Sequence, residues 1–118
     1  MADAATQRVV ADLTAELSAL PGAGPVSHVV GDVARRADCE AMAAAALERH
    51  GGIDVLCANA GIFPSVALSD MTEAELDQVM DTNVKGMILA VQACIPALAA
   101  TGRGRIVLTS SITGPITG

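Results

Sequence analysis

The fold is decided by the stretch Ile53-Asp54-Val55-Leu56-Cys57-Ala58-Asn59-Ala60-Gly61, an apolar run of strand length that ends in small residues and one amide side chain. A strand covered on both faces of a parallel sheet has such an unbroken apolar run, and ligands of open α/β sheets bind beyond the carboxyl ends of the strands. Small residues let a ligand approach the backbone, and Asn59 offers both a donor and an acceptor. The stretch therefore predicts a buried parallel strand ending at a binding site. The simpler alternative is a tight strand-to-loop turn.

Composition limits the class of protein. With 118 residues, 52% of them hydrophobic, the chain is one small domain or a piece of one, and it has enough apolar residues for a core. A net charge of -6 argues against a nucleic-acid partner, because phosphate binding needs clustered Lys and Arg. We read no segment as a membrane span or a signal peptide, and we expect a cytoplasmic protein with no membrane partner.

The cysteines and histidines do not indicate a metal site. Cys39, Cys57 and Cys94 are odd in number, far apart and in apolar surroundings, so we expect free buried thiols and no disulfide. His28 and His50 have no partners at the spacing of metal ligands, and we expect no metal.

The first half of the chain alternates helical and strand patterns. Apolar residues spaced by three to four predict a helix over 6–20, although 8–12 also reads as a strand ending in the acidic Asp12. The β-branched run Val26–Val30 predicts a strand with Asp32 at its tip. A helix capped by Asp38 follows, running to about His50, with Met42, Ala43, Ala46 and Leu47 on its inner face.

The second half repeats the alternation. After the strand at 53–58, Thr72 and Glu75 form the pattern of a capping box that opens a long helix to about Ala100. The run Arg105–Thr109 predicts another strand. These two strands, joined by the long helix, are expected to form a βαβ unit of a parallel sheet.

Several short motifs now stand in a recognisable order. They are Asp32-Val33, Asn59-Ala60-Gly61, Asn83-Val84-Lys85-Gly86, Gly104-Arg105-Ile106-Val107 and Ser110-Ser111-Ile112-Thr113-Gly114. Each is weak alone, but their order and spacing resemble the short-chain dehydrogenase/reductase family over nearly the whole chain. The apolar details look most like the bacterial 3-oxoacyl-[acyl-carrier-protein] reductases.

The resemblance implies a role for each matching residue. Asp32 and the backbone of Val33 would hold the adenine ring of a nicotinamide dinucleotide, and Asn59, Ala60 and Gly61 would line its adenosine-ribose side. For catalysis, Ser111 would hydrogen-bond the substrate carbonyl or hydroxyl, and Asn83 would hold a water of a proton relay. Without the other motifs, Asp32 and Ser111 would be read as ordinary turn residues.

Other parts of the family pattern do not occur in the sequence. The opening Thr-Gly-x-x-x-Gly-x-Gly turn, which binds the pyrophosphate, and the Tyr-x-x-x-Lys pair are absent, and the chain has no Tyr. The sequence of residues 113–118 is similar to the glycine-rich turn, and we interpret this similarity as coincidental. The residue that selects NAD or NADP in the family also falls outside the chain, and we favour NADP over NAD.

The resemblance also implies an incomplete sheet. In the family order 3-2-1-4-5-6-7, the predicted strands are the third, fourth and fifth, while the first, second, sixth and seventh are missing. The fold class is therefore α/β, a partial Rossmann-like doubly wound parallel sheet, and residues 1–118 form a single incomplete NAD(P)-binding domain. A gap two strands wide would separate Val26–Val30 from the strand at 53–58, leaving Val26–Val30 to pair elsewhere or to remain an exposed edge.

Two functional hypotheses follow. In the first, the chain is an internal fragment of an NAD(P)-dependent reductase of 3-oxoacyl thioesters or similar small carbonyl compounds, inactive alone, whose full-length parent is a homodimer or homotetramer. In the second, it is a non-catalytic piece that associates with a full-length relative through the 72–100 helix. A third alternative, a flavodoxin-like binding domain, lacks a visible phosphate-binding loop.

Overall fold

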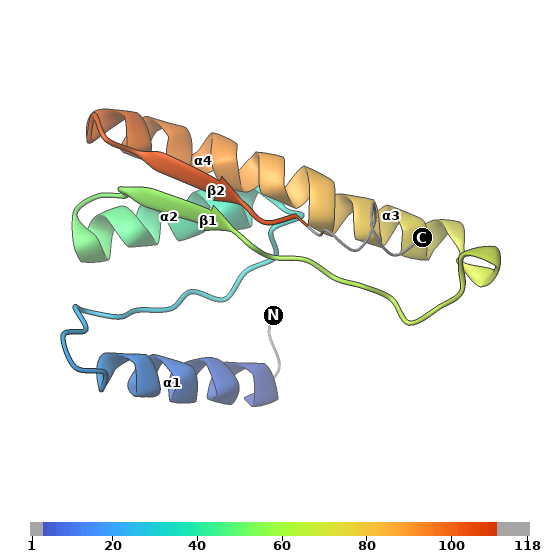
Figure 1. The fold of residues 1–118 in the computed structure, drawn as a ribbon, viewed down its shortest axis with the longest axis horizontal. Helices are drawn as coiled ribbons and strands as arrows, with labels where there is room; N and C mark the ends of the chain where they lie inside the picture. The colour runs from blue at the N-terminus through green and yellow to red at the C-terminus, as the bar shows by residue number, and fades with distance from the viewer. Residues whose placement is uncertain (1–3, 111–118) are drawn as a thin grey trace.

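A computed structural model describes residues 4–110 of the chain. Figure 1 shows the elements in sequence order. They are helices α1 (Ala4–Ser18) and α2 (Arg36–His50), strand β1 (Val55–Ala58), the short 3-10 turn η1 (Leu68–Asp70), helix α3 (Glu73–Met80), the π-helical turn η2 (Asp81–Lys85), helix α4 (Gly86–Ala100) and strand β2 (Arg105–Leu108).

The two strands are parallel neighbours, as predicted, but β1 is not the buried strand that its apolar run predicted, because its residues alternate between exposed and half-buried and β2 is exposed throughout. Their register runs from Val55 opposite Arg105 to Ala58 opposite Leu108. Backbone hydrogen bonds continue the pairing beyond both ends of β1, where Arg105 N–H donates to the Asp54 carbonyl at 2.9 Å and Thr109 N–H to the Ala58 carbonyl at 3.1 Å. Helices α3 and α4 connect the strands, so β1, α3–α4 and β2 form the expected βαβ unit of a partial Rossmann-like α/β fold.

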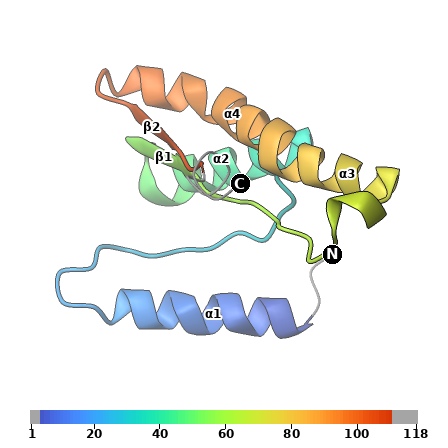
Figure 2. The ribbon, with the colours of Figure 1, turned by 45° about the vertical axis from the view of Figure 1, so that its right-hand side comes forward.

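The core lies between α2, α4 and the strands. Ala43 of α2 packs with Cys94 and Leu98 of α4, and the partly buried Ile53 and Leu56 pack against this cluster. Figure 2 shows α2 and α4 together beside the strands, with α1 set apart from them. The inner face of α2 includes Met42, Ala43 and Ala46 as predicted, whereas Leu47 is 43% exposed. The core is small because its helices are rich in alanine.

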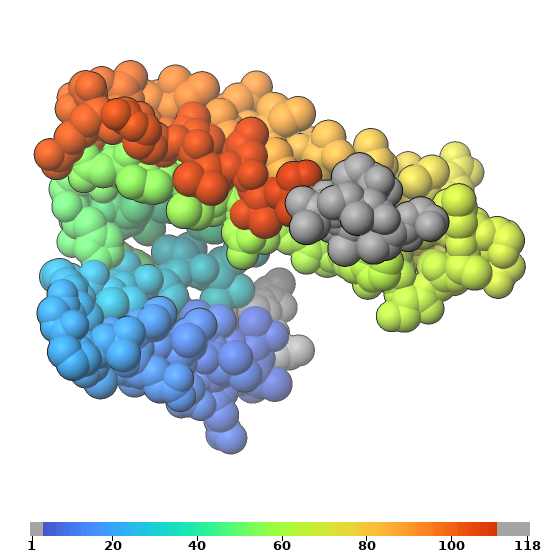
Figure 3. Space-filling model, in the orientation of Figure 1, coloured from blue at the N-terminus to red at the C-terminus, as the bar shows by residue number. Residues whose placement is uncertain are grey.

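Residues 26–30 do not form the predicted strand. The segment has no regular secondary structure, and it runs extended beside α1, separated from β1 by a hollow that is visible in Figure 3. A strand needs a neighbour for its backbone groups, and the sheet among residues 4–110 has only β1 and β2. Side chains tie the segment to the helices instead. Arg49 donates to the His28 carbonyl at 2.8 Å, and Ser27 Oγ lies 2.7 Å from His50 Nε2.

Helix α1 confirms the helical reading of the N-terminal pattern over the strand alternative, but its apolar stripe is not covered. It buries none of its residues, and Val9, Leu13 and Leu17 are 65%, 51% and 41% exposed. The stripe that predicted the helix therefore has no core to join among the described residues.

The start of α3 agrees with the sequence prediction, whereas the start of α2 differs from it. Thr72 and Glu75 form the predicted capping box at the start of α3. Helix α2 starts earlier than expected, with Arg35 at the N-cap, so Asp38 is not its cap. Asp38 lies in the first turn, where a carboxylate suits the helix dipole. Gly51 ends α2 with φ 80°, a conformation that favours glycine.

The long helix differs from the prediction in two ways. A π-helical turn over 81–85 interrupts it, which the apolar spacing did not indicate. By length and composition, Glu73–Ala100 is also apolar enough to cross a membrane, contrary to our expectation, and 22% of the tested stretch is buried. Its inner side packs on α2 and both strands, as in the core helix of an α/β domain. Its outer side exposes Leu76, Met80, Val84 and Ile88, each about half exposed, and Ile95 is similarly exposed beside Ile106 of β2.

Candidate functional site

The turn that carries Asp32 is held by its own side chain and by α2. Asp32 Oδ1 accepts a hydrogen bond from the Ala34 N–H at 2.9 Å, and the Asp32 N–H donates to Asp38 Oδ2 at 2.9 Å. The Cys39 thiol lies 3.3 Å from the Val33 carbonyl and donates to it. The Asp32–Val33 turn is therefore fixed at both of its residues by the first turn of α2.

The loop after β1 lies beside this turn. An open groove is lined on one side by Gly31 to Ala34 and on another by Ala60, Gly61 and Ile62, with α3 and η2 supplying the remaining wall. Two of the predicted binding segments, separate in the sequence, thus share one groove at the carboxyl end of β1. This is the position where open parallel sheets bind ligands.

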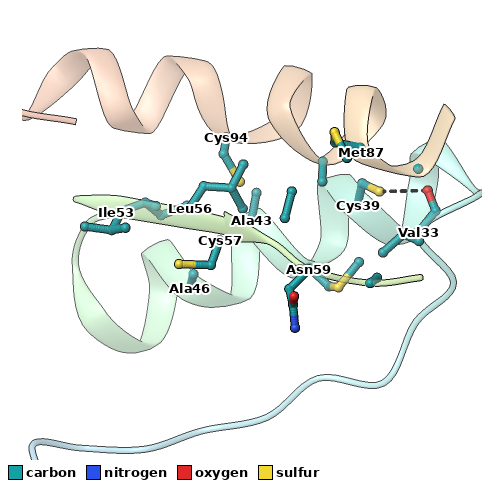
Figure 4. Close-up of a pocket in the computed structure, with 16 residues that line it drawn as sticks. Val33, Cys39, Ala43, Ala46, Ile53, Leu56, Cys57, Asn59, Met87 and Cys94 are labelled. Carbon is teal, nitrogen blue, oxygen red and sulfur yellow. Dashed lines mark hydrogen bonds between the residues drawn. The ribbon is translucent and has the colours of Figure 1, made fainter. Parts of the chain in front are cut away.

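A second cavity of about 290 Å³ adjoins the same segments. Figure 4 shows Val33 and Asn59 at its rim, with Cys39, Ala43 and Ala46 from α2 and Met87 and Cys94 from α4. The Asn59 side chain points away from α4 in this view. The cavity walls are almost entirely apolar, so Asn59 is its main polar group.

Asn83 holds the loop rather than standing free. Its Oδ1 accepts from the Ile62 N–H at 2.8 Å, and its Nδ2 donates to the Ile62 carbonyl at 2.9 Å. The pair of bonds ties the π-helical turn to the residue after Gly61. A Cβ built on Gly61 would lie 3.4 Å from Asn83 Oδ1, so the small residue permits this approach. The role of Asn83 toward a bound water stays a prediction.

Ser111 lies outside the described residues, and its expected role also stays a prediction. The strand that precedes it, β2, is parallel to β1. The carboxyl ends of the two strands therefore lie at the same edge of the sheet.

The cysteines fit the expectation of free thiols but not of complete burial. Cys39 and Cys94 are buried, whereas Cys57 is exposed. Burial raises the pKa of both Cys39 and Cys94, and the nearby Asp38 carboxylate raises the pKa of Cys39 further. Both thiols are therefore kept protonated and inert. Cys57 was expected to be buried because its surroundings in the sequence are apolar, but β1 has a neighbouring strand on one side only among residues 4–110.

Sequence reasoning did not assign to three residues the contacts by which they shape the site. Asp38 and Cys39 hold the Asp32–Val33 turn, and Gly86 lets α4 approach it. A Cβ built on Gly86 would lie 2.7 Å from Val33 Cγ2, closer than real contacts allow. The available signal was a glycine inside a helix, which costs about 1 kcal/mol relative to alanine and so calls for a packing reason.

The fold is that of an α/β protein with a parallel sheet, and a groove lies at the carboxyl end of its strand β1. Comparison with known proteins then identifies the protein family. The family model described as short chain dehydrogenase matches residues 2–118. The chain belongs to the short-chain dehydrogenase/reductase family, as its motif order predicted.

Curated relatives agree with this family. Dehydrogenase/reductase SDR family member 4 of Oryctolagus cuniculus is 41% identical over 106 residues, which cover 89% of this chain and 38% of that protein. Cis-2,3-dihydrobiphenyl-2,3-diol dehydrogenase of Paraburkholderia xenovorans is 45% identical over 94 residues, 75% of this chain and 34% of that protein. An uncharacterized oxidoreductase of Listeria monocytogenes is 39% identical over 83 residues, 70% of this chain and 34% of that protein. The chain thus spans about a third of the length of these relatives.

The residues present fit one end of the family's cofactor. Proteins of this family generally use NAD or NADP. Asp32 brings a carboxylate to the groove, which suits the exocyclic amino group of adenine, and Ala60 and Gly61 leave room for a flat ring or a ribose. The adenosine end therefore has a matching set of residues, whereas the glycine-rich turn for the pyrophosphate does not occur in this sequence.

Proposed function

We propose that this chain carries the adenosine-binding part of an NAD(P)-dependent oxidoreductase. A protein of family length built around it would interconvert carbonyl and hydroxyl groups. The observation that supports this most is the groove in which the Asp32–Val33 turn meets the loop that contains Ala60 and Gly61. The family match over residues 2–118 supports the same conclusion independently.

In this proposal each predicted residue has a separate task. Asp32 accepts from the adenine amino group, since a carboxylate has about four acceptor sites and Ala34 occupies one of them. Asn59, Ala60 and Gly61 line the ribose side. Ser111 hydrogen-bonds the reacting oxygen of the substrate, and Asn83 organises the loop and the proton path. NADP is our choice over NAD.

Two different sequence similarities each support one candidate substrate class. The resemblance of the sequence to 3-oxoacyl-[acyl-carrier-protein] reductases favours an acyl thioester with a 3-oxo group. The 45% identity to a cis-dihydrodiol dehydrogenase makes a small vicinal diol the second candidate. Both are small molecules that exchange a hydride with a nicotinamide.

The test is an activity assay on a protein of family length that contains residues 1–118. We expect turnover of NADPH with an acetoacetyl thioester, and NAD⁺ reduction with a cis-diol is the competing outcome. Changing Ser111→Ala should lower kcat by roughly two to three orders of magnitude, the effect of losing one transition-state hydrogen-bond donor. Cofactor affinity should hardly change. A loss of cofactor affinity as large as the loss of kcat would show that Ser111 is structural.

The 118-residue chain itself should show no turnover. Hydride transfer needs an aligned nicotinamide and a proton donor, and this sequence has neither the glycine-rich turn nor a Tyr. Turnover above that of the Ser111→Ala variant of the same chain would contradict this expectation.

The exposed side of α3–α4 supports an assembly role in the same proposal. Leu76, Met80, Val84 and Ile88 are each about half exposed and leave apolar surface on this helix open to a partner. We propose that the family-length protein is a homodimer or homotetramer through this face. The alternative is that the chain docks on a full-length relative through the same face.

A further inference from the structure

The Asp32–Val33 turn depends on a residue outside the groove. Asp38, in the first turn of α2, is half-buried, and its Oδ2 accepts the Asp32 N–H at 2.9 Å. Asp38 is absent from the residues that line the groove, so it does not face a ligand there. It contacts the backbone of the residue that does.

The approach between this turn and α2 is close. A Cβ built on Gly31 would lie 3.3 Å from the Asp38 Cβ, tighter than most real contacts. The next residue of α2 continues the attachment, because the Cys39 thiol donates to the Val33 carbonyl. On the other side, Gly86 brings the start of α4 against Val33. The turn is therefore held between two helices, and Asp38 supplies a charged contact to it.

Two hydrogen bonds connect Asp38, through the backbone of Asp32, to the Asp32 carboxylate. Asp38 fixes the Asp32 backbone, and Asp32 Oδ1 in turn accepts from the Ala34 N–H at 2.9 Å. A hydrogen bond to an ionised acceptor is roughly twice as strong as one between neutral groups. Releasing the Asp32 N–H would therefore free both the backbone and the orientation of the Asp32 carboxylate.

We propose that Asp38 is a positioning residue for nucleotide binding, which sets the orientation of the Asp32 carboxylate by holding its backbone N–H. This inference rests on the proposed function, since Asp32 is there the partner of adenine. It assigns to α2 a part in binding, although α2 contributes no side chain to the groove. A free Asp32 carboxylate would bind the nucleotide more weakly than a fixed one, because part of the binding free energy would be used to orient it.

The experiment uses the ¹⁵N-labelled 118-residue chain and adenosine 5′-monophosphate (AMP) as the probe. Three variants are compared: Asp38→Ala, Asp38→Asn and Glu40→Gln. Asp38→Asn keeps an acceptor oxygen without the charge. Glu40→Gln makes the same change of charge two residues away, on an exposed position of the same helix. Each variant is measured for amide hydrogen exchange of Asp32, for AMP affinity and for helix content.

We expect Asp38→Ala to accelerate exchange of the Asp32 amide and to weaken AMP binding roughly tenfold. Asp38→Asn should lie between this variant and the unchanged chain, with affinity weakened roughly two- to threefold, because the neutral bond is the weaker one. Glu40→Gln should match the unchanged chain. The partial rescue by Asn is the result that a merely structural role for Asp38 would not give.

Any one of three outcomes of the Asp38→Ala and Glu40→Gln measurements overturns the proposal. They are unchanged Asp32 exchange in Asp38→Ala, faster exchange with unchanged AMP affinity, and an equal loss of affinity in Glu40→Gln. If Asp38→Ala loses helix content, the Asp38→Asn variant is the deciding one. An AMP affinity of Asp38→Asn equal to that of the unchanged chain then overturns the proposal. Absence of AMP binding by the unchanged chain contradicts the proposed function and the nucleotide role together. The exchange of Asp32 then still shows whether Asp38 holds the turn.

Discussion

At the scale of single residues, the site is built by backbone contacts as much as by side chains that face a ligand. Asn83 illustrates this, because both ends of its amide group bind the backbone of Ile62, 21 residues earlier. An amide can donate and accept at once, and a carboxylate of the same shape can only accept. The type of residue at this position is therefore set by the loop that it holds.

We predict that Asn83→Ala loosens this loop. Two hydrogen bonds of ordinary strength are lost, at a cost of about 1–2 kcal/mol to the local structure. The exchange rate of the Ile62 amide, measured by NMR, should rise accordingly. Asn83→Asp is the informative comparison, since it keeps the acceptor for the Ile62 N–H and places a carboxylate against the Ile62 carbonyl. If the Asn83→Asp variant protected the Ile62 amide as well as the unchanged chain does, the donor half of the pair would have no role.

At the scale of elements, the chain shows which sequence patterns form their structure through local contacts alone. The capping box at Thr72 is local, and it forms as predicted: Thr72 N–H and Oγ1–H both donate to Glu75 Oε2, at 2.8 and 2.7 Å. These hydrogen bonds hold the pKa of Glu75 below its ordinary value. A lowered pKa in the folded chain means that protonation favours the unfolded helix end.

The resulting prediction concerns pH. The contribution of the capping box should be complete above the ordinary Glu pKa of about 4.3 and should be lost as the pH falls through the lower pKa of the folded chain. Thr72→Ala should reduce the protection of the α3 amides at neutral pH roughly fivefold, because the N-cap hydrogen bond is lost. It should also flatten their dependence on pH in that window. Thr72→Ser is the matched control, and an Ala variant with the same pH profile as Ser would rule out the capping box as the cause.

Patterns that need distant partners were predicted less well. The β-branched run at Val26–Val30 has strand composition, but a strand also needs a neighbour, and residues 4–110 provide none beside it. Cys57 was expected to be buried because of its apolar surroundings in the sequence, and it is exposed. The family motifs, in contrast, placed Asp32 and the Ala60–Gly61 loop at one groove. Asp38, Cys39 and the π-helical turn had no signal in the apolar spacing, because their contacts are made to backbone.

At the scale of the whole molecule, the chain has little buried apolar surface. Among the described residues, buried hydrophobic side chains are confined to α2 and α4, while the apolar stripes of α1 and of the outer side of α3–α4 are exposed. Small domains are already marginally stable, since chain entropy nearly cancels the gain from burial. The chain therefore folds as a βαβ unit with α2 packed on it, and the remaining apolar surfaces are available for association.

We predict that the purified chain is partly helical, loosely packed and self-associated. Hydrogen exchange should show protection concentrated in Ile53–Ala58 and Val84–Ile95, with little in Val26–Val30. Ile88→Glu, on the outer side of α4, should shift the chain toward monomer in sedimentation velocity. Leu68→Glu is the control, because Leu68 is 85% exposed and lies in η1, outside α3 and α4.

A sharp cooperative melt of a monomer would contradict this picture, if it came with Val26–Val30 as protected as Ile53–Ala58. It would mean that the described strands and the 26–30 segment close into a complete sheet of their own.

The most direct test of the central claim is a map of amide chemical-shift changes when AMP is added to the ¹⁵N-labelled chain. The claim is that the turn at Asp32 and the loop after β1 form one adenosine-binding groove. We predict saturable shifts at Asp32, Val33, Asn59, Ala60 and Gly61, and their loss in Asp32→Ala but not in Asp70→Ala, which changes a carboxylate of η1 that does not line the groove. Shifts confined to other elements, or equal binding by both variants, would contradict the claim.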